Sequence, residues 1–281
     1  MIRTLFTRKE SPAQNLQQAL GTPDLPSFPD LVWRVQEMLR DPEVPLTKTG
    51  RLIAADPGLS AQLIKTVNCA AYGLPNRVNS ASHALSMLGP RKVESIVLSI
   101  AVKKALPTHF KGGFDPAGFW RSSAIRAVTA SSLARLLDPA SADLSFTAAL
   151  LQDMAVPLIA RHNHKAYAPV LSAWRAGEEG LDVLEHEMLG YTHAEIAGWM
   201  SEKWAFPEDL RKAIQDHHNL DQGPTAVTLV ALLKEGENDE GTELLMETVR
   251  EHYGIGTDRI ALLLKRCEEE AKQLTQLLAG L

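Results

Sequence analysis

Three groups of polar side chains lie in apolar surroundings in this 281-residue sequence, and their types can do chemistry. Gln152 and Asp153 stand side by side after the apolar run FTAALL, His193 opens a segment with helical spacing, and His217 and His218 close another. Carboxylates and imidazoles bind metal ions, exchange protons and hold polar ligands. A carboxylate that leaves water is costly unless it is paired, hydrogen-bonded or bound to a cation. Asp153 therefore predicts either the centre of a polar site or a structural hydrogen-bond anchor.

The elements that must position these side chains are helices. Apolar residues recur at three- and four-residue steps, with no convincing period-two alternation and no Asn-Gly or Asp-Gly hairpin signal. Pro157 cannot donate to the carbonyl of Asp153, so the central helix is expected to end or kink just after the polar pair. Thr192 and Glu195 have capping-box spacing, which makes His193 the first residue of a helix. The fold class expected is all-α.

Composition narrows the function. Hydrophobic residues make up 45% of the chain, which supports a substantial core, and the net charge of -5 argues against an electrostatically driven nucleic-acid binder. No apolar run is long enough to span a bilayer, and the N-terminus lacks the apolar segment of a signal peptide. The isolated cysteines, Cys69 and Cys267, favour a reducing, cytoplasmic compartment.

Several segments, taken in order, resemble the HDOD family, a divergent branch of the HD metal-dependent phosphohydrolase superfamily. The resemblance covers about residues 25–219. The segments that carry it are LPSFPDLVWRVQEMLRDPEVPLTKTGRLIAADPGLSAQLIKTVNCAAYG, ALSMLGPRKVESIVL, GFWRSSAIRA, FTAALLQDM and LGYTHAEIAGWMSEKWAFPEDLRKAIQDHH.

The resemblance implies an HD-domain-like helical bundle with an N-terminal helical lobe. Residues 1–20 would form a separate, disordered N-terminal segment. The HDOD domain would cover 21–219, with the helical lobe at about 21–110 and the HD-like lobe at about 115–219. Residues 220–281 would form a helical C-terminal extension. Family members are mostly bacterial signalling or regulatory proteins.

The chain departs from the catalytic HD pattern at two metal ligands. By resemblance, an early histidine falls near Ser122, and the first member of the His-Asp pair is Gln152, so only Asp153 of that pair remains. Serine is a poor ligand unless it is deprotonated, and a glutamine oxygen binds cations weakly. The resemblance thus implies a vestigial site or ligand pocket made of Ser122, Gln152, Asp153, His193, His217 and His218.

Loss of two imidazoles should remove most affinity for a transition metal, so no metal and no other cofactor is expected. Should an ion bind, its ligands would be Asp153, His193 and His217. An inert polar network is favoured, a pocket for a small polar or anionic ligand comes second, and hydrolysis comes third. The function expected is bacterial signal transduction by a non-catalytic module that binds a partner protein or a small signalling ligand. The alternative is a residual metal-dependent phosphohydrolase acting on a nucleotide or phosphodiester.

The last helix carries a long apolar stripe with two interpretations. It is either a coiled-coil seam that makes a homodimer through residues 257–281, or a helix packed on its own domain. The stripe consists of Ile260, Leu264, Cys267, Ala271, Leu274, Leu278 and Leu281.

Overall fold

A computed structural model describes residues 25–110, 113–221, 223–233 and 239–279, and these ranges contain helices and no strand. The all-α prediction is confirmed, and the segment 1–20 lies outside the described residues. The helices are α2 (Asp30–Arg40), α3 (Leu46–Ala54), α4 (Pro57–Val67), η1 (Ala70–Tyr72), α5 (Ala81–Leu88), α6 (Pro90–Ala105), α7 (Pro116–Leu137), η2 (Pro139–Ser141), α8 (Ala142–Leu151), α9 (Ala155–His162), α10 (His164–Arg175), α11 (Leu181–Leu189), α12 (His193–Lys203), α13 (Glu208–Gln215), α14 (Ala226–Ala231), α15 (Asp239–Tyr253) and α16 (Thr257–Ala279).

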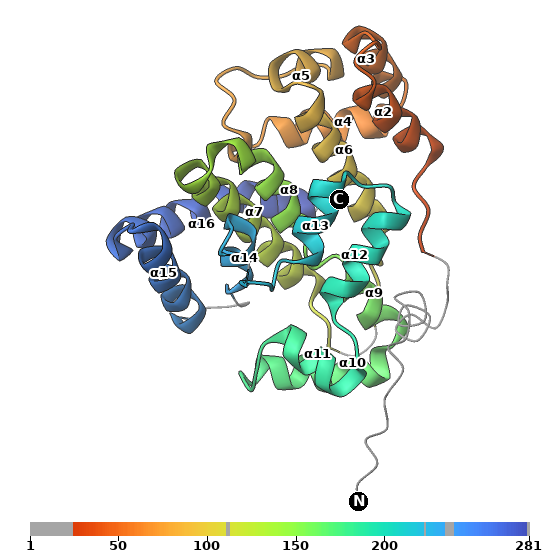
Figure 1. Cartoon of the computed structure of the whole chain (residues 1–281). Helices are drawn as coiled ribbons and strands as arrows, with labels where there is room; N and C mark the ends of the chain where they lie inside the picture. The colour runs from red at the N-terminus through yellow and green to blue at the C-terminus, as the bar shows by residue number, and fades with distance from the viewer. Residues whose placement is uncertain (1–24, 111–112, 222, 234–238, 280–281) are drawn as a thin grey trace, which may run out of the picture.

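Helices α2 to α6 make an N-terminal lobe, at the top of Figure 1. Proline and small polar residues set its boundaries: Asp56 caps α4 by accepting the N–H of Leu59, and Pro57 occupies the first helical position. Gly89, at φ 78°, separates α5 from α6 in a backbone conformation that favours glycine. The lobe connects to the rest of the molecule through α6, which packs against both α2 and α8.

Helix α7 runs through the centre of the molecule and packs against α8, α14 and α16 (Figure 1). It is rich in serine and alanine, whose small side chains let neighbouring helices approach closely. One of its buried hydroxyls bonds locally: Ser123 Oγ donates to the carbonyl of Phe119 at 2.9 Å. A polar side chain on this helix is therefore close to several other elements at once.

The expected break in the central helical stretch is confirmed. Helix α8 ends at Leu151, residues 152–154 form a turn, and α9 begins at Ala155. Pro157 cannot bond to the carbonyl of Asp153, which instead accepts the N–H of Val156 at 2.9 Å. The turn places Gln152 and Asp153 between two buried helices, so their side chains are not part of the apolar face of either helix.

Helix α16 packs on its own chain. The stripe from Ile260 to Leu278 is buried against α7 and reaches α4 and η1 of the N-terminal lobe. Gln273 Oε1 accepts the backbone N–H of Ala70 at 3.1 Å, which ties the two ends of the fold together. The face expected as a dimer seam is thus occupied within the chain, and a homodimer through α16 would need another face.

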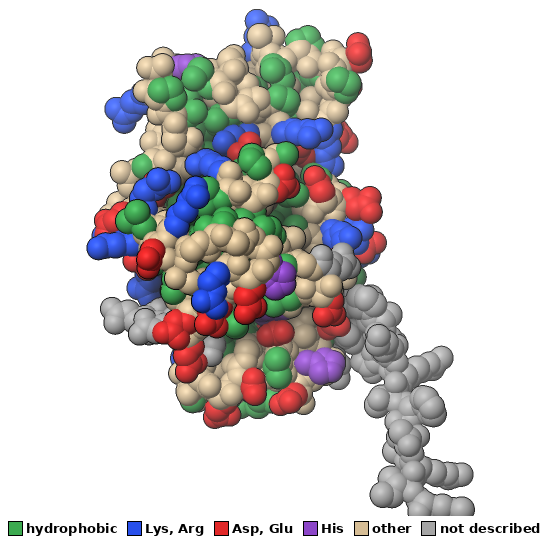
Figure 2. Space-filling view, turned by 60° about the vertical axis from the view of Figure 1, so that its left-hand side comes forward, with side chains coloured by type: hydrophobic (Ala, Val, Ile, Leu, Met, Phe, Trp, Pro, Cys, Tyr) green, Lys and Arg blue, Asp and Glu red, His purple; other side chains and the backbone are tan. Residues whose placement is uncertain are grey.

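One segment of the described residues is long and apolar enough to span a membrane by length and composition, although the sequence led us to expect none. The segment Pro139–His162 reaches a mean hydropathy of 1.2 over 18 residues, but 83% of that window is buried inside the fold, as expected of a core segment. Figure 2 shows one face on which Lys and Arg side chains are interspersed with Asp and Glu, without a continuous basic surface.

Candidate functional site

Asp153 sits in the α8–α9 turn and divides its two carboxylate oxygens between different partners. Oδ2 accepts a hydrogen bond from Nη1 of Arg126 on α7 at 2.5 Å. Oδ1 lies 3.3 Å from Nε2 of His193 and 3.4 Å from Nε2 of His217. The Asp153 side chain is only 12% exposed. A carboxylate buried to this extent is costly without partners, and these three contacts supply them.

His193 is the first residue of α12, as the capping box predicts. Thr192 Oγ1 accepts the N–H of Glu195, and Glu195 Oε2 accepts the N–H of Thr192. The imidazole of His193 is 1% exposed. Its Nδ1 lies 2.6 Å from Oε2 of Glu185 on α11, which fixes the proton on Nδ1 because a carboxylate can only accept.

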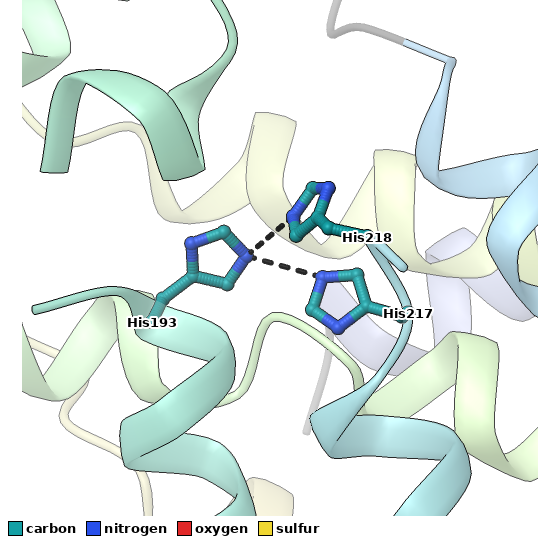
Figure 3. Close-up of side chains that lie close together, drawn as sticks. All are labelled: His193, His217 and His218. Carbon is teal, nitrogen blue, oxygen red and sulfur yellow. Dashed lines mark hydrogen bonds between the residues drawn. The ribbon is translucent and has the colours of Figure 1, made fainter. Parts of the chain in front are cut away.

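His217 and His218 follow the end of α13 and approach His193 together. Nε2 of His193 lies 3.2 Å from Nε2 of His217 and 3.1 Å from Nε2 of His218 (Figure 3). Nδ1 of His217 donates to the carbonyl of Ile214 at 2.6 Å, so its Nε2 faces the cluster. His217 is buried and His218 is 27% exposed.

The charges in this cluster are strongly coupled. Burial alone would raise the pKa of Asp153, but the Arg126 guanidinium and the hydrogen bonds from His193 and His217 hold that pKa well below its usual range. Burial opposes charge on His193, yet the carboxylates of Glu185 and Asp153 raise its pKa to about 10. Burial and the other two imidazoles hold the pKa of His218 far below its usual range. The two carboxylates therefore keep the imidazole of His193 protonated near neutral pH.

Arg126 connects the cluster to the C-terminal extension. Its Nη2 donates to the carbonyl of Leu233, just beyond α14, at 2.6 Å. Its Nε is buried without a hydrogen-bond partner among the described residues, and so is Oε1 of Gln152. Buried polar atoms are normally satisfied, so these two atoms are exceptions within the polar network around Asp153.

A cavity of about 270 Å³ adjoins the cluster. Arg126, Gln152, Asp153, His193 and His218 line its polar side. Phe119, Trp174 and Leu181 are among its apolar walls. A mostly apolar cavity with a few convergent polar groups is the usual form of a small-ligand site.

The structure brings together most of the residues that the sequence singled out. Asp153, His193, His217 and His218 form the cluster, and Gln152 lines the adjoining cavity. Ser122 is buried on α7 but is not among the residues that line this cavity. Three further residues near the cluster, Arg126, Glu185 and Tyr167, were not predicted from the sequence. Arg126 does carry a signal, because it lies seven residues after the buried Phe119 on α7, whereas on α11 no buried apolar residue lies one turn before Glu185.

The donor set fits one divalent transition-metal ion. The three histidines His193, His217 and His218 each offer a ring nitrogen, and these nitrogens lie within 4.8 Å of one another. Asp153 Oδ1 lies 3.3 Å from Nε2 of His193 and 3.4 Å from Nε2 of His217. Nε2 of His193 lies 3.2 Å from Nε2 of His217 and 3.1 Å from Nε2 of His218. A tetrahedral ion with bonds of about 2.0–2.1 Å places its ligands about 3.3–3.4 Å apart. His193 and His217 each hold an outer acceptor on Nδ1, the arrangement that orients metal-binding histidines. Both His217 and His218 lie in this group, whereas only one of them was expected to be a candidate ligand.

Comparison with known proteins agrees with this fold. The family model for the HDOD domain matches residues 25–220. The chain is 24% identical over 212 residues to an uncharacterized protein of Treponema pallidum (strain Nichols), a match that covers 72% of this chain and 39% of that protein. The chain thus spans less than half the length of that relative.

Solved structures show the same architecture. An HDOD domain protein from Geobacter sulfurreducens superimposes with a TM-score of 0.70 at 22% identity, covering 94% of this chain and 98% of that one. A candidate phosphohydrolase from Shewanella amazonensis SB2B gives 0.72 at 23%, covering 95% and 98%. A candidate signal transduction protein from Marinobacter aquaeolei VT8 gives 0.68 at 21%, covering 97% and 62%. At these identities the likeness shows the fold alone.

Proposed function

This chain belongs to the HDOD family, and from that premise we propose that it is a regulatory HD-superfamily protein that holds one divalent transition-metal ion and catalyses no turnover. The ligands would be His193, His217, His218 and Asp153. The observation that carries the proposal is the convergence of three histidine nitrogens within 4.8 Å of one another, with Asp153 Oδ1 3.3 and 3.4 Å from Nε2 of His193 and His217. The sequence led us to expect no metal, because Ser122 and Gln152 replace two imidazoles; the cluster of three histidines is the reason to propose an ion.

The number of protein ligands favours a structural or regulatory ion. Structural sites are closed by four protein ligands, whereas catalytic sites keep a position open for water or substrate. Four donors are available here, and Ser122 and Gln152 stand where catalytic relatives carry further imidazoles. An ion bound here would contribute folding free energy by joining the α8–α9 turn, α12 and the residues after α13. Arg126 would hold Asp153 with Oδ1 directed toward the imidazoles.

The regulatory event we propose is the binding of a small polar or anionic ligand, or of a partner signalling protein. The cavity supports the first of these, because Gln152 Oε1 and Arg126 Nε lack hydrogen-bond partners within the described residues and both side chains line it. We place the protein in the cytoplasm, because Cys69 and Cys267 are both free and buried.

Metal analysis of the purified protein tests the proposal. After dialysis against Zn²⁺ and removal of the excess, we expect one ion per chain in the wild type and a large loss in His217→Ala and Asp153→Ala. His186→Ala is the matched control, because His186 is exposed on α11 and outside the cluster. If the wild type retains no more zinc than the two cluster variants, the ion site does not exist.

A residual phosphohydrolase is the second candidate, and the adjoining cavity is the observation in its favour. His218 lines that cavity and is 27% exposed. If the His218 side chain moved away from a bound ion, the ion would have an open coordination position facing the cavity. The assay is hydrolysis of bis(p-nitrophenyl) phosphate with Mn²⁺ or Mg²⁺. Turnover that requires the ion and disappears in Asp153→Ala would establish the hydrolase and reject the non-catalytic proposal.

A further inference from the structure

Glu185 is a fully buried carboxylate, with 0% of its surface exposed. On α11 only Leu184 and Glu185 are buried. Ionised side chains are almost never buried in this way unless their oxygens are fully used. The contacts of Glu185 therefore indicate why the chain keeps it there.

Both oxygens of Glu185 have partners, and one oxygen holds His193 at two points. Oε2 accepts the backbone N–H of His193 at 2.6 Å and the ring Nδ1–H at 2.6 Å. Oε1 accepts the hydroxyl of Tyr167, which is itself 0% exposed. The backbone bond fixes the oxygen relative to the start of α12, and the ring bond then fixes the imidazole relative to that oxygen. Rotation of the ring would break the Nδ1 bond inside the protein.

We propose that Glu185, held by Tyr167, is the positioning residue of the ion site. It keeps a proton on Nδ1 of His193 and directs Nε2 toward Asp153, His217 and the ion. This role rests on the proposed metal site, although the orientation of the ring exists without an ion. A carboxylate or carbonyl on the outer nitrogen is the usual way in which a protein fixes a metal-binding histidine.

Two conservative variants test this role. Glu185→Gln keeps the shape of the side chain but replaces the carboxylate with a weaker, neutral acceptor, and Tyr167→Phe removes only the hydroxyl that holds Glu185. Glu187→Gln is the control, since Glu187 is exposed on the same helix. Zinc affinity is measured by competition with a chromophoric chelator. We expect Glu185→Gln to bind zinc about 10- to 100-fold more weakly at unchanged stoichiometry. Tyr167→Phe should show a smaller loss and the control none.

A second readout separates positioning from a merely structural role and does not need the metal. The Nδ1–H proton of His193 is followed by NMR on histidine-labelled protein and assigned from its loss in His193→Gln. We expect a slowly exchanging signal in the wild type and its loss in Glu185→Gln, while circular dichroism shows both proteins folded. If Glu185→Gln does not fold, Tyr167→Phe decides, with faster exchange expected.

The outcomes distinguish this inference from the proposed function. Wild-type zinc affinity in a folded Glu185→Gln variant overturns the positioning role and leaves the metal site standing. If the wild type binds no zinc, the proposed function fails, and the His193 signal alone decides. Its persistence in Glu185→Gln then overturns the positioning role, whereas its loss supports an orienting role for Glu185.

Discussion

Replacing Arg126 with methionine removes the guanidinium that contacts both Asp153 and the carbonyl of Leu233. The side chains of this ion pair are only 10% and 12% exposed. Removal of one partner from a buried pair costs about 3–5 kcal/mol, because the remaining charge is left uncompensated. The positive charge of the His193 imidazolium partly compensates the negative charge of Asp153. Leu233 lines the cavity, where water can replace Arg126 as the hydrogen-bond donor to the Leu233 carbonyl. We therefore expect the lower end, about 3 kcal/mol of unfolding free energy.

The assay is urea unfolding, followed by circular dichroism at equal protein concentration without added metal. Arg121→Met is the matched control, because Arg121 is exposed on the same helix and its loss should change the unfolding free energy by less than about 0.5 kcal/mol. The double variant Arg126→Met/Asp153→Asn removes both charges, so it should recover at least about 1 kcal/mol relative to the sum of the single variants. Stability of Arg126→Met equal to that of Arg121→Met would refute the account of a buried, mutually dependent pair.

Three further predictions concern the ion, the helix cap and the last helix. Zinc must displace the proton that the carboxylates of Glu185 and Asp153 hold on His193. The apparent Kd for zinc, measured by chelator competition, should therefore rise about tenfold for each unit by which the pH falls from about 8.5 to about 6.5. A pH-independent Kd would contradict this. Thr192→Ala should lower the unfolding free energy by about 1 kcal/mol through loss of the capping box, and no change in urea midpoint would count against it. Leu274→Ala should cost about 2–5 kcal/mol with unchanged mass in light scattering, whereas Leu262→Ala, at a position 72% exposed, should cost nearly nothing. A change of mass without a loss of stability in Leu274→Ala would instead indicate an intermolecular seam.

Local features of the site were predictable from sequence because they depend on neighbouring residues. Pro157 dictates the break after α8 through its missing N–H group, and the Thr192–Glu195 pair marks His193 as the start of α12. His217 continues the buried stripe of α13, as its seven-residue spacing from Leu210 predicts. These statements need no knowledge of how the helices pack.

The composition of the cluster was less predictable because it depends on how separate helices approach one another. His218 points off the stripe of α13, yet its Nε2 reaches His193 because the chain leaves the helix at residue 216. Ser122 was expected in the site by alignment, but Arg126, one turn later on α7, is the residue that contacts Asp153. Glu185 was not predicted as a site residue, because its burial depends on how α11 packs against Tyr167 and His193.

Anomalous diffraction at the zinc edge, from crystals of the zinc-loaded protein, tests the central claim most directly. We predict one anomalous peak per chain, bonded to Nε2 of His193, His217 and His218 and to Oδ1 of Asp153, with no bound water. A cluster without a peak would contradict the metal site. An ion held by fewer than four of these donors, with water completing its coordination, would contradict the closed, non-catalytic site.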